Sequence, residues 1–150
     1  MKRQDEIFSY KSAEDATGFL LYKLFMHWQK TIKERLKEVE LTHTQFVILA
    51  TSGWLGLHKE VVTQIEIARH AQMDVMMVSN VLRALERKGI LSRHSHPQDT
   101  RAKQILLTPK GQKILKRSVK IVEDFDHAFF DRLEDVGGFN RSMRQLLEFE

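Results

Sequence analysis

Polar and basic side chains recur along one face of the stretch at residues 74–89. Helical spacing places Met76, Asn80, Arg83 and Arg87 opposite an apolar stripe. An α-helix fits the major groove of duplex DNA, where each base pair presents its own pattern of hydrogen-bond donors and acceptors. Asn80 can read an adenine edge, and Arg83 can read a guanine edge or bind a phosphate. The pattern therefore predicts a helix that is presented to DNA.

Neighbouring residues extend this predicted contact surface. Methionine and valine side chains suit thymine methyl groups, and basic side chains on a following β-hairpin suit phosphates. Arg101 lies near the tip of that hairpin, where it can enter a minor groove. Asp99 has two interpretations: it orients Arg101 through a charge-assisted hydrogen bond, or it only forms the turn. The predicted DNA-binding residues are Val75, Met76, Met77, Ser79, Asn80, Arg83, Arg93, Arg101 and Lys103.

Positive charge is concentrated in the part of the chain that holds these residues. Between residues 83 and 120 there are eleven Lys and Arg residues against two acidic residues, although the net charge of the whole chain is only +4. The rest of the chain is therefore acidic. Charge segregated in this way is typical of a surface that faces phosphates; a solvated, lysine-rich helix face is the alternative. A DNA complex held by these cations should weaken steeply as salt is raised.

Helix start signals divide the chain into the elements that would position this surface. Capping boxes begin at Ser12, Thr42 and Thr63, Asp74 is an N-cap, and Thr108 precedes a proline at the first helical position. Apolar periodicity predicts helices over 12–39, 42–54, 63–71, 74–89, 108–133 and 139–149, and strands over 90–95 and 102–107.

Glycines and apolar residues refine these limits. Gly53 and Gly56 are expected to end the second helix, and Gly137–Gly138 to separate the last two. In the helix over 63–71, Ile65 is expected to be buried, with Ile67 as a further candidate. Two short helices joined by a tight turn and followed by a hairpin make a winged helix-turn-helix, so the predicted fold class is mainly α with a small β-hairpin wing.

The first predicted helix is long for a chain of this size. It would span roughly 40 Å at 1.5 Å per residue, and its apolar stripe is too long to be covered by one small core. The segments after the hairpin also hold five phenylalanines, at positions 125, 129, 130, 139 and 149. We therefore expect the N- and C-terminal helices to pair with a second chain, and residues 1–11 to form a flexible lead-in.

Four ordered motifs run through the chain. They are Leu41-Thr42-x-x-Gln45-Phe46, Leu85-Glu86-Arg87-Lys88-Gly89-Ile90-Leu91 with Arg93, Asp99-Thr100-Arg101, and Leu107-Thr108-Pro109-Lys110-Gly111. In their order and spacing they resemble the MarR family of bacterial transcriptional regulators, over essentially the whole chain. The resemblance implies one MarR-like domain over residues 1–150, with a winged helix-turn-helix DNA-binding lobe at 42–111 and dimerisation helices at 12–39 and 112–149.

The resemblance also implies partners. A member of this family is an obligate homodimer that binds a pseudo-palindromic operator in double-stranded DNA, usually as a repressor, and a small anionic or phenolic effector often releases it. The effector pocket of the family lies between the dimer helices and the DNA-binding lobe. Candidate residues for that pocket in this chain are His27, Trp28, His43 and Trp54. For each of them the alternative is an ordinary structural role, as a core tryptophan or as a surface or capping histidine.

Other classes of function find little support in the sequence. No glycine-rich phosphate loop, nucleophile elbow or His-Glu-x-x-His helix is present, so neither an enzymatic activity nor a cofactor is expected. The chain has no cysteine, no secretory signal and no run of about 18 apolar residues, so a cytoplasmic location away from the membrane is expected. His94 and His96 with Asp99 lack a fourth ligand, so proximity to phosphates is favoured over a metal site there. A regulatory metal at His27, His43 or His127 stays an open alternative. The remaining alternative is a winged-helix protein-interaction module without specific DNA binding.

Overall fold

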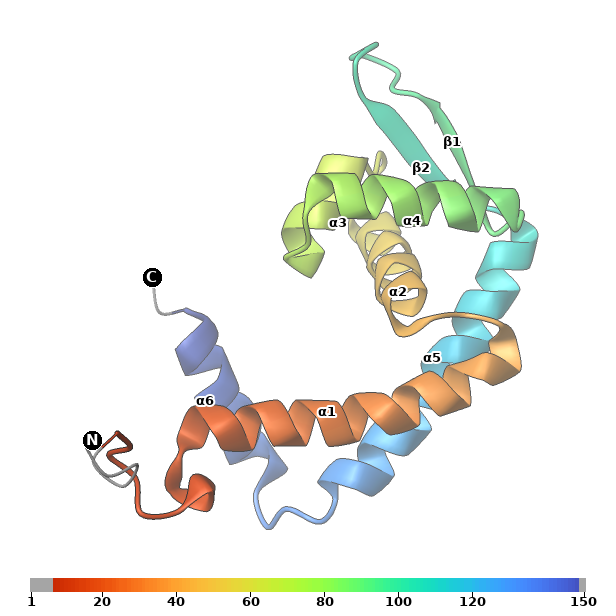
Figure 1. The fold of residues 1–150 in the computed structure, drawn as a ribbon. Coiled ribbons are helices and arrows are strands. Elements are labelled where there is room, and N and C mark those ends of the chain that lie inside the picture. Colours follow the sequence, from red (N-terminus) through yellow and green to blue (C-terminus); the bar gives the residue numbers. More distant parts are fainter. Residues whose placement is uncertain (1–6, 149–150) are drawn as a thin grey trace.

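A computed structural model describes residues 7–148 of the chain, and Figure 1 shows its fold. The helices are α1 (Thr17–Leu36), α2 (His43–His58), α3 (Gln64–Ala71), α4 (Val75–Arg87), α5 (Pro109–Phe130) and α6 (Val136–Leu147), and the strands are β1 (Leu91–Ser95) and β2 (Lys103–Leu107). Short 3-10 helices at Ala13–Asp15 and Lys37–Val39 flank α1. This mainly helical fold with one antiparallel hairpin confirms the predicted fold class. Residues 1–6 of the predicted lead-in, and the predicted dimer residue Phe149, lie outside the described residues.

Four side-chain caps begin the helices that surround the hairpin, as predicted. Thr42 and Thr63 each form a capping box with the third residue of the helix that follows. Asp74 accepts hydrogen bonds from N–H groups in the first turn of α4, and Thr108 accepts one from the N–H of Gly111. Since such a cap typically contributes about 1 kcal/mol, local side chains fix where these helices start.

The first helix begins later than predicted. The hydroxyl of Ser12 accepts a hydrogen bond from the N–H of Glu14 at 3.1 Å, and it caps only the short 3-10 helix. Ala16 is extended (φ −85°, ψ 99°), and α1 starts at Thr17 without a side-chain cap. The prediction of one continuous helix over 12–39 was therefore wrong, because an extended residue separates the first turn from α1 and the last turn tightens to a 3-10 helix.

The two predicted glycine breaks were also wrong. Helix α2 continues through Gly53 and Gly56. A Cβ on Gly53 would lie 2.3 Å from the side chain of Leu115, so this glycine permits the close approach of α5. Helix α6 includes both glycines of the second break, because the Asp135 carboxylate accepts a hydrogen bond from the N–H of Gly138 at 2.7 Å and caps the helix there.

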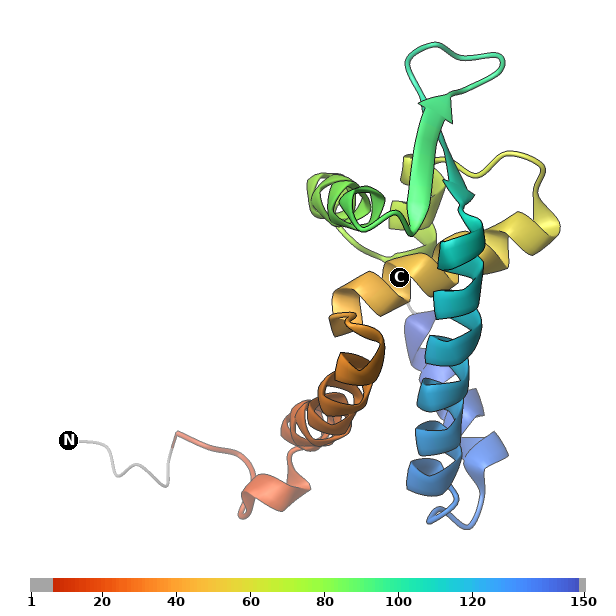
Figure 2. The same cartoon turned by 90° about the vertical axis from the view of Figure 1, so that its right-hand side faces the viewer.

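Helix α2 lies between α3 and α4 on one side and α1 and α5 on the other (Figures 1 and 2). Its residues Ile48 and Leu49 are fully buried and belong to one continuous core with side chains from α1, α3, α4, α5 and the hairpin. In α3 the core-facing residue is Ile67, which is fully buried, whereas Ile65 is 56% exposed. The prediction of Ile65 as a core residue was therefore wrong. None of the described helices is both long and apolar enough to span a membrane.

The hairpin is anchored to the helices at its base. Strands β1 and β2 are antiparallel, with Leu91 opposite Leu107 at the base. The N–H of Ile105 donates a hydrogen bond to the carbonyl of Val62, the residue before the cap of α3, at 2.8 Å. The loop at the other end projects away from the helices (Figure 2). A fixed base and a projecting loop give the hairpin the shape of a wing.

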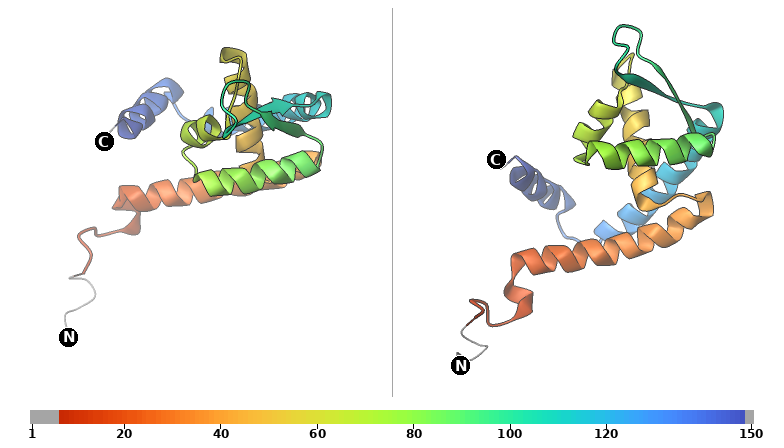
Figure 3. Two further views of the ribbon diagram at one scale, coloured as in Figure 1. Left: turned by 90° about the horizontal axis from the view of Figure 1, so that it is seen from above. Right: turned by 45° about the horizontal axis from the view of Figure 1, so that its top comes forward.

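An exposed apolar surface remains where α6 and the N-terminal half of α1 extend away from the core (Figures 1 and 3). Only Ile32 and Leu36 of α1 are buried, and no residue of α6 is. The exposed apolar residues of α1 are Phe19, Leu20, Leu21, Tyr22, Leu24, Phe25 and Met26, at 38–62% exposure. In α6, Leu146 and Leu147 are 73% and 69% exposed. We call this set the terminal apolar surface; a single chain does not cover it.

Candidate nucleic-acid interface

Helix α4 presents one exposed row of side chains on the side away from the core. Met76, Asn80, Arg83 and Arg87 follow one another at spacings of four, three and four residues, so they lie along one face of the helix. All four are exposed, and Met76 is 66% exposed. We call these residues the α4 row. Two arginines, Arg83 and Arg87, make the C-terminal half of the row basic.

The N-terminal tip of α4 is apolar. Val75 and Met77 flank the row and are 42% and 43% exposed. The Asp74 carboxylate turns back onto the helix, where its Oδ1 accepts hydrogen bonds from the backbone N–H groups of Met76 and Met77 at 2.9 and 3.1 Å. The tip therefore offers three apolar side chains to a partner, with the acidic group engaged as the cap.

Asn80 and Arg83 are joined to each other. Nη1 of Arg83 donates a hydrogen bond to the side-chain oxygen of Asn80, which lies one helical turn earlier, at 3.2 Å. Both residues are exposed. The oxygen of the Asn80 amide is therefore engaged within the protein, and its NH₂ group remains as a donor.

Ser79 does not belong to the exposed face. It is only 6% exposed, because the buried face of α4 extends one residue beyond Val78. Sequence spacing alone placed Ser79 beside Asn80 and made it a candidate for a base contact. With its side chain inside the fold, we remove Ser79 from the candidate interface.

Arg93 on β1 is paired within the protein. Its Nε and Nη2 atoms both lie 2.8 Å from the same carboxylate oxygen of Glu86 on α4, and its side chain is only 24% exposed. The pair ties the first strand of the wing to the end of α4. Lys103, at the far end of β2, is exposed instead, so of these two predicted phosphate ligands Lys103 has the more accessible position.

The wing loop carries Arg101 as an exposed residue. The Asp99 carboxylate accepts a hydrogen bond from the backbone N–H of Arg101 at 3.0 Å, which is the turn-forming alternative of the sequence interpretation. Nδ1 of His96 accepts hydrogen bonds from the N–H groups of Gln98 and Asp99 at 3.0 and 3.1 Å. These local bonds fix the backbone of the loop.

Two lysines of the basic segment hold α4 in place, a role that their charge alone did not indicate. The ammonium of Lys88 donates to the carbonyl of Glu40, in the link between α1 and α2. The ammonium of Lys110, in the first turn of α5, donates to the carbonyl of Lys88 at 2.7 Å. A cation at the C-terminus of a helix also interacts favourably with the helix dipole. The C-terminal end of α4 is thus tied to two other elements.

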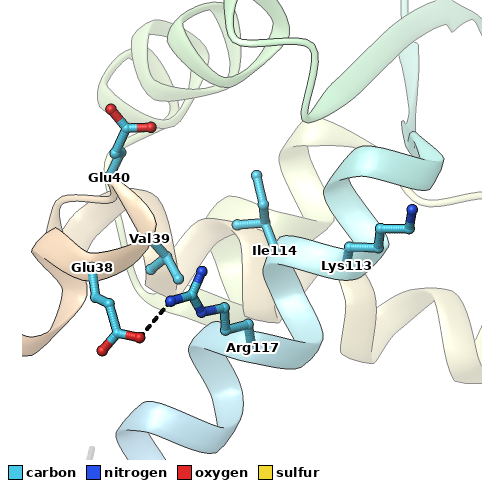
Figure 4. Close-up of a pocket in the computed structure, with 6 residues that line it drawn as sticks. All are labelled: Glu38, Val39, Glu40, Lys113, Ile114 and Arg117. Carbon is cyan, nitrogen blue, oxygen red and sulfur yellow. Dashed lines mark hydrogen bonds and ion pairs between the residues drawn. The ribbon is translucent and has the colours of Figure 1, made fainter.

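A small hollow lies beside these ties, between the α1–α2 link and α5 (Figure 4). Its volume is about 250 Å³, and Arg117 reaches across it to Glu38. The lining residues are Glu38, Val39, Glu40, Lys113, Ile114 and Arg117. Ligand pockets usually exceed about 300 Å³, and this hollow mixes acidic with basic groups. We therefore assign no ligand to it.

Two of the predicted pocket residues meet at the junction of α1, α2 and α5. The indole N–H of Trp28 donates to the Asp126 carboxylate at 2.7 Å, and the rings of Trp28 and His43 form a T-shaped pair at a centroid distance of 5.3 Å. His43 is within hydrogen-bond distance of Gln29, at 3.1 Å. Burial lowers the pKa of His43, and the charge of Lys33 lowers it further. The structure thus brings Trp28 and His43 together.

The other two predicted pocket residues lie apart from this junction or at its edge. His27 is exposed, and its ring lies 5.8 Å from that of Phe129. Trp54 is 56% exposed, and its ring lies 4.9 Å from that of His58, between ring centres. Trp54 follows His43 by eleven positions in α2, which is about 16 Å along a helix. Trp54 therefore does not join Trp28 and His43.

Comparison with known proteins identifies relatives over almost all of the chain. The model described as "MarR family" matches residues 41–103, from the start of α2 to the second strand of the wing. The HTH-type transcriptional regulator YdcH of Bacillus subtilis (strain 168) is 36% identical over 141 residues, which is 94% of this chain and 96% of YdcH.

Solved structures with the same fold include complexes. S. aureus MepR bound to DNA is 27% identical, with a TM-score of 0.77 over 91% of this chain and 97% of MepR. CouR from Rhodococcus jostii RHA1, bound to p-coumaroyl-CoA, is 21% identical, with a TM-score of 0.79 over 93% and 94% of the two chains. A mutant MarR from E. coli complexed with operator DNA is 21% identical, with a TM-score of 0.78 over 87% and 92%. For the last two the likeness is one of fold.

Proposed function

This chain belongs to the MarR family, and from that premise we propose that it is a transcriptional regulator that binds double-stranded DNA sequence-specifically. The observation that carries the proposal is the α4 row, an exposed helix face beside a wing in the most basic segment of the chain. The row would lie in the major groove, with α3 bracing α4 near the backbone. Arg101 in the wing loop would enter the adjacent minor groove, and Lys103 would contact a phosphate.

The terminal apolar surface supports a homodimer. Monomeric proteins rarely leave contiguous apolar patches of this kind exposed, and seven large apolar residues of one helix are exposed here. A second copy of the chain offers the same surface and can cover it under two-fold symmetry. The dimer would present two α4 rows about one helical turn of DNA apart, roughly 34 Å. A pseudo-palindromic operator is the expected target.

A small-molecule effector is the third part of the proposal. CouR, a relative in fold, binds p-coumaroyl-CoA. In this chain Trp28 links α1 to α5 through Asp126 and contacts His43 at the start of α2. A ligand that separated these side chains would change the angle between the dimer helices and the lobe that carries α4. We place the protein in the cytoplasm, as a repressor that such a ligand releases.

Fluorescence anisotropy with a labelled duplex of random sequence tests the DNA-binding proposal. At low salt the dimer should bind with micromolar affinity or better, and the logarithm of the binding constant should fall by roughly 0.9 per contacted phosphate for each unit of log salt. Lys103→Ala should flatten that slope by about one such step. Lys37→Ala removes an exposed lysine at the end of α1 and is the matched control, with no expected change.

The result that would overturn the proposal is the absence of binding at low salt by a folded dimer. Circular dichroism and sedimentation establish folding and dimerisation on the same sample. A folded dimer without affinity for any duplex would favour the protein-interaction module instead. Equal effects of Lys103→Ala and Lys37→Ala would remove the wing from the interface.

A further inference from the structure

We propose that the α4 row contacts only the keto edges of bases, which are guanine N7 and O6 and the O4 and methyl group of thymine. Asn80 then acts as a positioning residue for Arg83 and does not read adenine. This proposal rests on the proposed DNA binding, and it specifies the base edges that α4 contacts.

The α4 row can donate hydrogen bonds but has little left to accept them. The guanidinium groups of Arg83 and Arg87 are donors only, and the thioether of Met76 is at most a weak acceptor. Asn80 brings the one strong acceptor of the row, and that oxygen already accepts from Arg83 at 3.2 Å. What remains for a partner is a set of N–H donors and an apolar tip.

The acidic groups of α4 do not replace the missing acceptor. The Asp74 carboxylate accepts from the backbone N–H groups at the start of the helix. The Glu86 carboxylate accepts from Arg93 on β1. Both carboxylates lie off the α4 row and are held by neighbouring parts of the protein, so neither extends along the face that a groove would meet.

The bases differ in whether they present hydrogen-bond acceptors or amino donors in the major groove. Guanine presents two acceptors, and thymine presents one acceptor and a methyl group, whereas adenine presents an amino donor beside a single acceptor, N7, and cytosine presents an amino donor alone. An amino group opposite the donor-only row would lose its hydrogen bond to water without replacement, which is costly. A bidentate contact of asparagine with adenine would have to share the side-chain oxygen of Asn80 with Arg83, which already donates to it. The row therefore suits guanine at Arg83 and thymine methyl groups at Met76.

Asn80 also limits where Arg83 can point. Arginine loses considerable rotamer freedom when a contact forms, and a guanidinium that is already held loses less. The hydrogen bond from Nη1 leaves the other N–H groups of Arg83 to make a paired contact with guanine. Asn80 thus acts on base selectivity through Arg83 and adds no phosphate contact.

Modified duplexes test the base edges directly. A preferred operator is first selected with the purified full-length protein, and its affinity is then measured by anisotropy after single-base replacements. Guanine to 7-deazaguanine should weaken binding about five-fold or more at the Arg83 position. Thymine to uracil should weaken it about four-fold at the Met76 position, since one methyl contact is lost. Adenine to purine deoxynucleoside, which removes only the 6-amino group, should leave affinity unchanged in the contacted half-sites.

Two substitutions test the role of Asn80. Asn80→Ala should bring the affinity ratio of the guanine and 7-deazaguanine operators close to one, while the salt dependence stays the same. Asn80→Asp keeps an acceptor for Arg83, so it should restore that ratio even though its charge weakens binding to all duplexes. Alanine is a good helix former at this exposed position, so a melting curve like that of the natural protein is expected for Asn80→Ala.

Different results would refute the keto-edge proposal and the proposed DNA binding on which it rests. Weaker binding after removal of adenine amino groups, or an unchanged guanine ratio in Asn80→Ala, would refute the keto-edge proposal and leave DNA binding intact. Binding with no sensitivity to any of the base replacements would also refute it. Failure to select any operator, with no affinity for duplex DNA at low salt, would refute the proposed function itself.

Discussion

Replacing Gly111 by alanine should detach the wing from α5. Gly111 is buried in the first turn of α5, and a Cβ at this position would lie 1.8 Å from the carbonyl oxygen of Ile90. Real Cβ atoms stay at least 3.0 Å from such an atom, so the turn and the carbonyl must separate by about 1.2 Å, the difference between these distances. The atoms that the added Cβ would meet first are backbone atoms of Ile90, and Gly111 itself lies in a helix. No flexible side chain can therefore move aside to relieve the clash.

That separation breaks the hydrogen bonds that join the two elements. The hydroxyl of Thr108 lies 2.6 and 3.0 Å from the carbonyl oxygens of Gly89 and Ile90, and its N–H donates to Ile90 at 3.1 Å. An extra 1.2 Å takes each distance beyond hydrogen-bonding range. The Thr108 hydroxyl carries one hydrogen, so its two contacts count as one bond beside that of the N–H group. Two lost bonds at about 1 kcal/mol each, with a carbonyl left unsatisfied at about 1–3 kcal/mol, give a destabilisation of roughly 3–5 kcal/mol.

Urea denaturation followed by circular dichroism, at one protein concentration, measures this effect. The midpoint should fall sharply in Gly111→Ala, with an unchanged slope if the unfolded state is unaffected. Gly56→Ala is the matched control, because Gly56 is also helical and an added Cβ there would meet nothing within 4 Å. It should stabilise α2 by about 0.5–1 kcal/mol. Equal midpoints for Gly111→Ala and the natural protein would refute the close-approach argument.

Other side chains give shorter tests. Arg93→Ala should lower the melting temperature but flatten the salt dependence of DNA binding less than Arg101→Ala does, because Arg93 is paired with Glu86; equal flattening in anisotropy titrations would contradict this. Burial lowers the pKa of His43 in the folded protein, so the unfolded chain binds the extra proton and stability should be full above about pH 6.5 and decline below it. His43→Gln should reduce that decline in urea titrations across pH, and an identical pH profile would exclude His43 as its source. Leu21→Glu should yield monomers in sedimentation experiments, because Leu21 is 62% exposed on the terminal apolar surface; a stable dimer would exclude this part of the surface from the interface.

The parts of the fold that could be predicted are those decided by neighbours in sequence. The hydroxyl or carboxylate caps at Thr42, Thr63, Asp74 and Thr108 act over two or three residues, and all four begin helices as expected. The positive φ of Gly89 likewise ends α4 where a C-terminal glycine predicts it. Each of these signals is a short-range hydrogen bond or a backbone preference, so the sequence contains all the information it needs.

The errors came from contacts between residues distant in sequence. Gly53 was expected to end a helix, but it is inside α2 because Leu115 of α5 occupies the space of a side chain. Ile65 and Ile67 are equally apolar, and only the packing of α3 against α2 and α4 decides that Ile67 is buried. Ser79 illustrates the same point in the candidate site, since helical spacing does not fix how far the buried face extends around α4.

The positive charge of the basic segment is plain from the sequence, but the structure shows that part of it makes contacts within the protein. Three cations of the basic segment make contacts that the count alone did not reveal: Arg93 pairs with Glu86, Lys88 with the carbonyl of Glu40, and Lys110 with the carbonyl of Lys88. These three contacts link the C-terminal end of α4 to the wing, to the α1–α2 link and to α5. The N-terminal half of the α4 row has no comparable tie among the described side-chain contacts apart from its cap and a long hydrogen bond from Gln64 to Val75 at 3.4 Å. The buried face of α4, from Val78 to Leu85, also packs against α2 and α3. A change in the angle between α1 and α5 would therefore reach α4 both through the ties at its C-terminal end and through this packing.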